Sequence, residues 1–386
     1  MMTATQQISA KTDNALKQYR DLCRYDILPW WLENGVDQKK GGFFEQVDLQ
    51  GNADRNCNRR VRIASRQIYS FSHAHTLGWT DAKATVLNGV DWLLDRTWGK
   101  NDQPGFLAKI DDDGKAVDQT RDLYDHAFHI LALSTAYQAT KDQQILSMAK
   151  STLDFVEEAL GAKNGGWFEN PNHDQPRRQN PHMHMFEALL ALYEVSADTA
   201  YLKRADDVAL LLFERFIDQK TGLLFEFFDT NWKPQIPAQI EPGHMVEWAW
   251  LLHRRNSFTA SRLNISAAAK FLQLGENIGL QPNGLLIDTC NIHGEPITDS
   301  SRLWVQTERL KALLIAPEQS QQIEQVCQQI FQDYINLPHP ALWIDAVNSK
   351  NQPLVDKVPA SIVYHLVSAA AQAEENLLPI NSGNTS

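Results

Sequence analysis

Residues 165–172, GGWFENPN, carry the phrase that decides the fold: glycine, two large apolar residues, then an acid. Variants of this phrase recur as GGFFEQVD from Gly41, PGFLAKIDDDG from Pro104, GLLFEFFD from Gly222, GLLIDTCNIHG from Gly284 and, more weakly, ALWIDAVN from Ala341. Counted at Gly42, Gly105, Gly166, Gly222, Gly284 and Ala341, the steps are 63, 61, 56, 62 and 57 residues. A regular period of this length indicates a repeat architecture of six units.

Each unit has room for two helices. The first shows helical periodicity but mixes small, aromatic and polar residues nearly all round, as in DLYDHAFHILALSTAYQA from Asp122. The second collects Lys, Asp and Gln on one face, as an outer layer exposed to water would. Strand-like runs are short and confined to the repeated phrase. We therefore predict an all-α fold, an (α/α)6 barrel (toroid) of about twelve helices with short β-hairpin loops on one rim.

An open solenoid of six helix pairs is the competing architecture, and it would need polar capping repeats at its ends. The last unit, VPASIVYHLVSAAAQA from Val358, is apolar and rich in small residues, which favours the closed ring. We predict one catalytic domain over residues 12–378, with flexible tails at 1–11 and 379–386.

Composition excludes several classes of partner. The net charge of −11, from 36 Lys+Arg against 47 Asp+Glu, argues against nucleic acid and anionic membrane surfaces. No run approaches roughly 18 apolar residues, and the polar N-terminus holds no hydrophobic signal core, so we predict no membrane span. The four cysteines are scattered without a C-x-x-C pair, as in a reduced, cytoplasmic protein. Monomer and homodimer both stay open.

A second repeat concerns polar residues near the start of each first helix, where a buried helix would not carry them without reason. They are Arg66, His126, His184, His244, Trp304 with Gln306 and Glu308, and His365, and the steps through Trp304 are 60, 58, 60, 60 and 61 residues. In a closed ring, residues at matching phase point to the same end of the central cavity. We therefore expect Arg, several His and Glu to meet at one mouth.

The chemistry of such a set suits proton transfer. Histidine titrates near neutral pH, and an arginine supplies a fixed positive charge for a developing oxyanion. Glu247 follows His244 by three residues on the same helix face, and Glu187 follows His184 in the same way. Each carboxylate could therefore orient its imidazole.

A metal site is the rival interpretation. His182, His184 and Glu187, joined by His126 or His244, have plausible ligand chemistry. Residues two apart face different ways on a helix, however, so the segment PHMH would have to be a loop. We predict no metal and no cofactor. The chain also has no G-x-S-x-G nucleophile motif, no P-loop and no G-x-G-x-x-G.

Five segments resemble the N-acylglucosamine 2-epimerase superfamily, which comprises sugar 2-epimerases and aldose–ketose isomerases on an (α/α)6 barrel. They are SRQIYSF from Ser65, RQNPHMHMFEALLALYE from Arg178, EPGHMVEWAWLL from Glu241, LWVQTER from Leu303 and YHLV from Tyr364, within a resemblance that spans about Tyr19 to Ala371. Within the family, NPHMHMFEALLALYE with a late YHLV is most similar to bacterial mannose isomerases and mannose 2-epimerases.

The resemblance implies the site residues position by position. It implies catalytic roles for Arg66, for His244 with Glu247, and for His365. Substrate binding is expected of a wider set of polar and aromatic residues: His184, Glu187, Trp304, Gln306, Glu308, Asp122, Tyr124, Phe186 and Trp248.

The implied reaction begins with opening of the pyranose. His244 then removes the C2 proton, and Arg66 holds the resulting cis-enediolate. Return of the proton to C1 converts D-mannose into D-fructose, whereas return to the opposite face of C2, from a second acid such as His365, gives the 2-epimer. We therefore predict an aldose–ketose isomerase acting on the monosaccharide D-mannose, with a D-mannose or N-acylglucosamine 2-epimerase as the alternative.

Other functions are more remote. An inverting glycoside hydrolase on the same fold would need a pair of carboxylates across the cavity, and a sugar-binding module would need no acid or base. A phosphosugar is a less favoured substrate, because Arg59, Arg60 and Arg62, near Arg66, are also what a solvated rim or an ion-pair network would contain.

Overall fold

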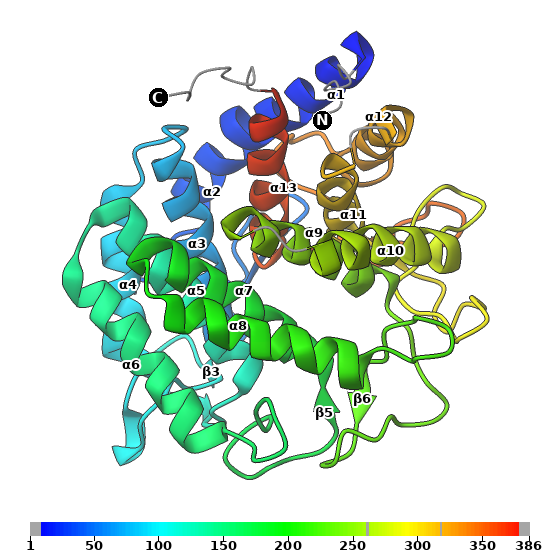
Figure 1. Ribbon diagram of the computed structural model, residues 1–386. Coiled ribbons are helices and arrows are strands. Elements are labelled where there is room, and N and C mark those ends of the chain that lie inside the picture. The colour runs from blue at the N-terminus through cyan, green and yellow to red at the C-terminus, as the bar shows by residue number, and fades with distance from the viewer. Residues whose placement is uncertain (1–8, 260–261, 317–318, 378–386) are drawn as a thin grey trace, which may run out of the picture.

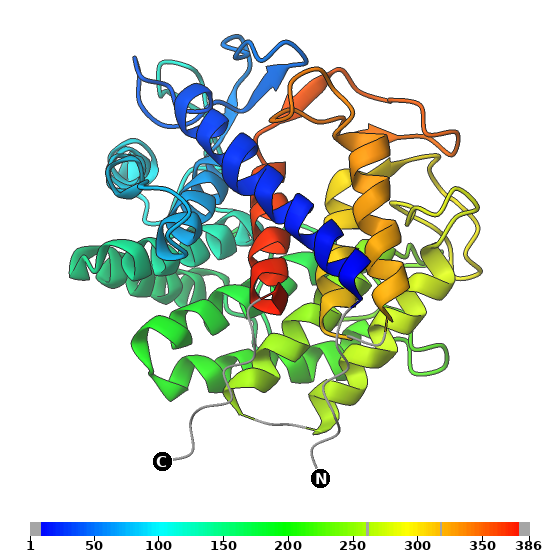
Figure 2. The same cartoon turned by 90° about the horizontal axis from the view of Figure 1, so that it is seen from above.

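The computed structural model describes residues 9–259, 262–316 and 319–377. In this part of the chain, two concentric layers of helices form an (α/α)6 barrel, which confirms the predicted fold class (Figures 1 and 2). The inner layer consists of α3 (Val61–Thr76), α5 (Leu123–Thr140), α7 (Gln179–Ser196), α9 (Pro242–Phe258), α11 (Leu303–Leu314) and α13 (Ile362–Leu377). Consecutive inner helices contact each other, and α13 contacts α3, so the ring is closed.

The outer layer covers the backs of the inner helices. It contains α4 (Lys83–Thr97), α6 (Gln143–Leu160), α8 (Thr199–Leu211), α10 (Arg262–Gly279) and α12 (Ser320–Gln329). The remaining outer position is filled by α1 (Ala10–Asp21) and α2 (Leu28–Asn34), joined by a π-helical turn at Leu22–Ile27. The N-terminal helix α1 packs against α12 and the C-terminal α13, so the two ends of the chain complete one unit together (Figure 2).

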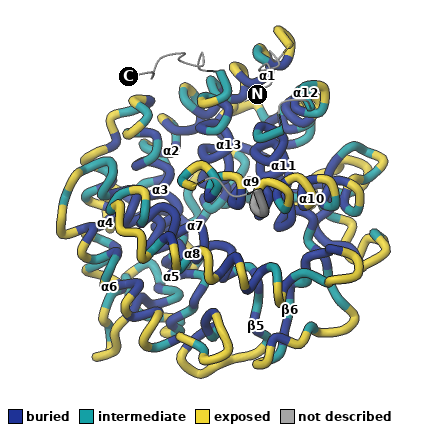
Figure 3. The backbone as a smooth tube through the Cα atoms, viewed as in Figure 1, coloured by how far each residue is buried: buried dark blue, intermediate teal, exposed yellow. Residues whose placement is uncertain are grey.

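Inner helices are buried on nearly all sides, whereas outer helices are buried on one face. Along α5 and α7 nearly every residue of the first three turns is buried, because neighbours lie on both sides and an outer helix lies behind (Figure 3). On α4 only one stripe is buried, from Val86 to Thr97. Helix α5 begins at the N-cap Asp122, whose side chain accepts a hydrogen bond from Asp125 N.

The strands are two or three residues long and lie on one rim. They are β1 (Gln46–Asp48), β2 (Arg59–Arg60), β3 (Lys109–Ile110), β4 (Ala116–Asp118), β5 (Arg177–Arg178), β6 (Phe227–Phe228), β7 (Ser301–Arg302), β8 (Ala346–Val347) and β9 (Lys357–Pro359). All ladders are antiparallel, in the orders β1-β9, β2-β3-β4, β5-β6 and β7-β8. Most pairs join successive units, and β1-β9 joins the first unit to the last.

The repeated phrase is held to its inner helix by a buried side chain. In the third unit Trp167 N donates to His182 Nε2 at 3.0 Å, while His182 Nδ1 contacts Arg178 O at 2.9 Å. Gly166 makes this approach possible: its φ is +65°, and a Cβ there would lie 2.4 Å from His182 Nε2. His126 and Gln306 make the equivalent bonds to the backbone of Phe106 and Leu286 in their own units.

The predicted boundaries need one adjustment. Helix α1 begins at Ala10, capped by Ser9, which lies before the predicted domain start at residue 12. Of the predicted tails at 1–11 and 379–386, residues 1–8 and 379–386 lie outside the described residues. None of the described helices combines the length and apolarity needed to span a membrane.

Candidate active site

A polar cavity of about 480 Å³ opens at the ends where the inner helices begin. Eight of the expected residues line it: Arg66, Asp122, Tyr124, His184, His244, Glu247, Trp304 and His365. They come from all six inner helices or from the residues just before them. The mouth at which the repeat phase predicts a site is therefore the mouth at which the structure brings these side chains together.

His244 is held by carboxylates from outside its own helix. Its Nδ1 lies 3.0 Å from Glu226 Oε2 and 3.5 Å from Glu241 Oε2. Burial by itself lowers the pKa of His244, but the charges of Glu226 and Glu241 outweigh it and raise the pKa to about 9. The structure thus places Glu226, and not Glu247, at the position that orients this imidazole, which is an imidazolium at neutral pH.

His365 has the opposite protonation state. Its Nδ1 lies 2.7 Å from Glu308 Oε1, a fully buried carboxylate on α11. Burial lowers the pKa of His365 well below its usual range, and the positive charges of Arg66 and Lys311 lower it further. At neutral pH this imidazole is therefore uncharged and can accept a proton at Nε2.

His184 and Glu187 form the pair that their spacing predicts. Nδ1 of His184 lies 3.1 Å from Oε2 of Glu187, and Tyr364 Oη lies 2.7 Å from both Glu187 oxygens. Burial lowers the pKa of His184. Burial alone would raise the pKa of Glu187, but the hydrogen bond and charge of His184, with Lys311 and Tyr364, lower it to about 2. Glu187 is therefore a carboxylate beneath the cavity rather than a residue that lines it.

Arg66 also lines the cavity, and its guanidinium forms no ion pair with a carboxylate among the described residues. Nη2 donates to Tyr124 Oη at 2.6 Å and Nη1 to Ser361 O at 3.3 Å, while its guanidinium lies over Phe128, 4.2 Å from the ring centroid. A guanidinium held in this way can stabilise a developing negative charge on a substrate.

Glu247 lines the floor as a neutral acid. It is buried, and its Oε1 has no hydrogen-bond partner in the described part of the chain. Burial raises its pKa well above the usual range; the charge of Glu308 adds to this, and Lys311 opposes it. Glu247 is therefore suited to donate a hydrogen bond or a proton.

Five residues expected in the site do not line the cavity: Glu187, described above, and Glu308, Gln306, Phe186 and Trp248. Gln306 makes hydrogen bonds with both the backbone N and the backbone O of Leu286, and so holds its hairpin loop to α11. Phe186 and Trp248 pack against each other with ring centroids 5.2 Å apart, and Trp248 Nε1 donates to Gln179 Oε1. Glu308 also lies beneath the cavity, behind His365. Gln306 thus points toward its hairpin loop, and the rings of Phe186 and Trp248 lie in the packing between α7 and α9.

The arginines at the rim of the cavity form ion pairs with carboxylates. Arg60 contacts Glu45, Arg62 contacts Asp125, Arg178 contacts Glu169 and Arg302 contacts Asp288. Arg59 contacts Asp37 and Asp112 away from the cavity. The ion-pair network considered from the sequence is therefore present, although Arg60, Arg62, Arg178 and Arg302 also line the cavity and were missed as site residues.

Glu226 was missed as well, and the repeat contains the signal for it. In three units the acid of the phrase, Glu45, Glu169 or Asp288, accepts a hydrogen bond from the backbone N of the arginine just before the inner helix. In the fourth unit the acid of the phrase is Glu226, but the residue before the inner helix is Glu241 instead of arginine. Without an arginine partner, Glu226 turns to His244.

The metal site considered from the sequence is not assembled, because His182 faces the hairpin phrase. Three other groups bring ligand atoms within 4.8 Å of one another: His184–Glu187–Glu247, Glu226–Glu241–His244 and Glu247–Glu308–His365. In each group the histidine Nδ1 is bonded to one of the carboxylates. We therefore assign none of these residues as a metal ligand.

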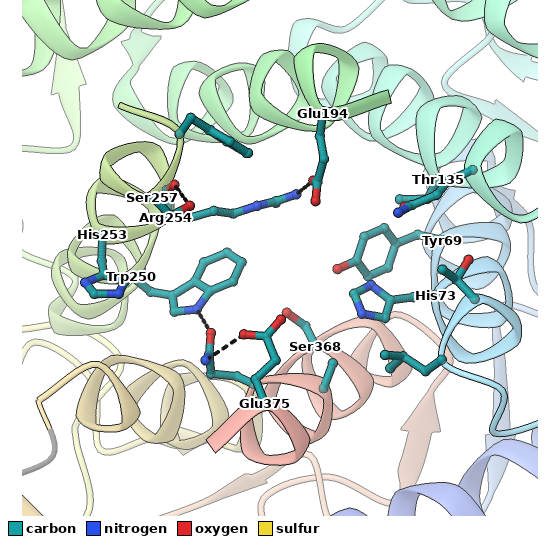
Figure 4. Close-up of a pocket in the computed structure, with 16 residues that line it drawn as sticks. Tyr69, His73, Thr135, Glu194, Trp250, His253, Arg254, Ser257, Ser368 and Glu375 are labelled. Carbon is teal, nitrogen blue, oxygen red and sulfur yellow. Dashed lines mark hydrogen bonds and ion pairs between the residues drawn. The ribbon is translucent and has the colours of Figure 1, made fainter. Parts of the chain in front are cut away.

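A second cavity, of about 320 Å³, lies at the opposite ends of the inner helices (Figure 4). Tyr69, His73, Trp250, Arg254 and Glu375 project toward its centre, and Arg254 pairs with Glu194. The imidazole of His73 packs against the ring of Tyr69 with centroids 5.6 Å apart, and burial lowers its pKa to about 4. Its histidines, His73 and His253, form no ion pair with a carboxylate among the described residues, unlike His184, His244 and His365 of the first cavity. The first cavity is therefore the candidate active site.

The chain is similar to known sugar isomerases and epimerases. The family model described as N-acylglucosamine 2-epimerase matches residues 42–369. A mannose-6-phosphate isomerase of Rhizobium meliloti is 33% identical over 371 residues, covering 91% of this chain and 94% of that protein. A D-mannose isomerase of Pseudomonas cannabina pv. alisalensis is 27% identical over 385 residues, covering 90% and 88%.

A solved structure shows the same fold. The crystal structure of a D-mannose isomerase superposes with a TM-score of 0.84 at 20% identity, covering 97% of this chain and all of that one. The match of the family model over most of the chain, together with the 33% identical relative, shows that this chain belongs to the N-acylglucosamine 2-epimerase family of sugar isomerases and epimerases.

Proposed function

We propose that the protein is an aldose–ketose isomerase whose best candidate reaction is D-mannose to D-fructose. The observation that carries the proposal is the arrangement of His244 and His365 around Trp304. Ring centroids of the two imidazoles lie 5.4 and 5.5 Å from that indole, which projects from the helix between theirs. Both use Nδ1 to bind a carboxylate, which leaves Nε2 for a sugar held at Trp304.

The protonation states assign the roles. His365 is neutral and takes the C2 proton at Nε2, while the C–H electron pair forms the C1=C2 bond of the enediol. His244, an imidazolium, gives a proton to O1, and Arg66 stabilises the charge that develops there. The O2 proton then returns to His244 as the C2 carbonyl forms, and His365 delivers its proton to C1. These roles reverse those expected from the family pattern, because carboxylates surround His244 whereas burial dominates at His365.

A 2-epimerase is the second candidate, and the same pair of imidazoles favours it. If His244 rather than His365 reprotonates the intermediate, and does so at C2 from the opposite face, the product is the 2-epimer. Both outcomes need the same residues and differ in which donor stands nearer to C1 or C2.

The charge balance of the cavity favours a neutral sugar over a phosphosugar. Each rim arginine already has a carboxylate partner, so an added phosphate would have to compete with that partner. A hydrolase is disfavoured because it would use a carboxylic acid and a carboxylate as its reacting pair, whereas the groups held by buried partners are imidazoles here.

The test is turnover of D-mannose in D2O, followed by NMR, with D-mannose 6-phosphate and a disaccharide as parallel substrates. We expect fructose that carries deuterium at C1. His365→Gln should slow C2 proton exchange by about 10²-fold or more, whereas His253→Gln, an exposed histidine farther along α9, should not. Glucose deuterated at C2 would point to the epimerase, and hydrolysis of the disaccharide without hexose turnover would overturn the proposal.

A further inference from the structure

One buried cation, Lys311, lies directly beneath the cavity. Its side chain is fully buried on α11, and Nζ lies 2.7 Å from Oε2 of Glu308. The other oxygen of Glu308 contacts His365 Nδ1 at 2.7 Å, so one carboxylate joins the ammonium to the imidazole. Lys311 itself does not line the cavity.

Trp250 covers Lys311 from the far side. The ammonium lies 3.9 Å from the centroid of the indole, a cation–π distance, and Trp250 Nε1 donates to Gln372 Oε1 at 2.7 Å. Trp250 also lines the second cavity, where Figure 4 shows its indole. Lys311 is therefore sealed between an aromatic ring and a carboxylate.

The charges around Lys311 do not balance without it. Three buried carboxyl groups, those of Glu187, Glu247 and Glu308, lie in this layer. Glu187 is bonded to His184 and Tyr364, and burial keeps Glu247 protonated. Burial raises the pKa of Glu308 as well, but the charge of Lys311 and its bond to this group oppose the rise. A buried carboxylate without such a partner is strongly destabilised.

We propose that Lys311 is a positioning residue of the proposed isomerase: its ammonium holds Glu308 as a carboxylate against Nδ1–H of His365 and keeps that imidazole neutral, with Nε2 free to act as the base. The role of His365 as a base rests on the proposed function, whereas the arrangement of Lys311, Glu308 and His365 does not. Nothing in the family pattern of the sequence, LWVQTER, includes this residue.

Charged and titratable groups on four other inner helices act on His365. Arg66 on α3, His184 and Glu187 on α7, Glu247 on α9 and Glu308 with Lys311 on α11 all face it. Of these, Arg66 and Lys311 are cations that disfavour the imidazolium. Removal of the Lys311 charge leaves Glu308 uncompensated, so the His365–Glu308 pair must take up a proton at a higher pH than before.

The decisive variant is Lys311→Met, which keeps the length and the apolar stem but removes the charge. Histidine is labelled with ¹³C at Cε1, the His365 signal is assigned by its loss in His365→Gln, and the signal is titrated by NMR. We expect its midpoint to rise by about one pH unit or more. The acidic limb of kcat/KM, where the base becomes protonated, should move up by the same amount.

Two controls separate positioning from damage to the fold. Lys311→Arg retains the charge and should return both midpoints toward the wild-type values. Arg254→Met removes a cation that pairs with Glu194 at the second cavity and should leave the His365 midpoint unchanged. An unshifted His365 midpoint in Lys311→Met overturns the proposal. This titration needs no substrate, so it tests the role of Lys311 even when the wild-type protein turns over no D-mannose. Absence of turnover would overturn only the proposed function.

Discussion

At the residue scale, the site consists of histidines that differ in their surroundings and not in their chemistry. His244, His365 and His184 are all buried, and each gives Nδ1 to a carboxylate. The two carboxylates near His244 make it a cation, whereas burial, with the charges of Arg66 and Lys311, keeps His365 neutral. One acid and one base at neutral pH therefore arise from the same residue type.

Glu226→Gln tests this assignment at His244. The proposed donor must be protonated, so activity falls as the pH rises through its pKa, which Glu226 helps to hold at about 9. Removal of the negative charge lowers that pKa, and the basic limb of kcat/KM should move to lower pH by about one unit or more. Glu241→Gln, at 3.5 Å instead of 3.0 Å, should shift the limb less. A basic limb that stays in place in both variants would remove His244 from the donor role.

At the scale of the element, three inner helices, α5, α7 and α11, begin where a side chain of their first turns bonds a hairpin loop. His126, His182 and Gln306 bond the backbone N of Phe106, Trp167 and Leu286. All three lie in the first turn or two of their helices and away from the cavity. In these helices the same turn carries both the side chain that bonds the hairpin loop and the residue that lines the cavity. His126 therefore falls at the sequence spacing of the site residues although its role is structural.

His182→Leu should lower the free energy of unfolding by about 1–3 kcal/mol, because Trp167 N would be buried without an acceptor. His182→Gln should lose less, since Gln306 makes the same bond in another unit. Denaturant unfolding of both variants measures the difference. The pH profile of any remaining activity should match that of the wild type, and a shifted profile would show that His182 acts on the catalytic groups after all.

At the scale of the whole molecule, the ring closes through its ends. α1 packs on α13, α13 packs on α3, and β1 pairs with β9 through Gln46–Pro359 and Asp48–Lys357. Closure turns six separate helix starts into one cavity and buries the polar side chains at its base. A solenoid of the same units would leave these groups in water, with ordinary pKa values.

Burial of many neutral histidines predicts acid sensitivity. The pKa is lowered by burial to about 4 for His126 and about 3 for His182, below the value near 6.5 of an unfolded chain. Stability from such a group is fully present above about pH 6.5 and is lost as the pH falls through the folded value, by up to about 1.4 kcal/mol per pH unit and histidine. His244 acts oppositely: its contribution is present below about pH 6.5 and is lost as the pH rises through about 9.

Urea unfolding between about pH 7 and about pH 5 measures this linkage. The free energy of unfolding should fall steadily over that interval. In His182→Leu the free energy of unfolding should depend less on pH, because the imidazole that takes up a proton on unfolding is gone. Its value at pH 7 should be lower than that of the wild type. A wild-type stability that does not change across the interval would show that the buried histidines are already charged.

The sequence by itself determined the period of about sixty residues, the closed ring, and the mouth at which Arg66, His184, His244 and His365 meet. It could do so because repeat length and helical phase are properties of spacing along the chain. The pairing of His184 with Glu187 was also within its reach, since the two lie on one helix face.

Only the tertiary structure decided which carboxylate holds His244 and His365, that Lys311 lies behind Glu308, and that Gln306, Phe186 and Trp248 face away from the cavity. Glu226 comes from a hairpin loop, and Glu308 comes from a neighbouring helix. Their effect acts through space across elements, and the protonation states depend on burial that exists only after the ring has closed. Spacing along one helix predicts neither, because a buried side chain takes the nearest partner in three dimensions.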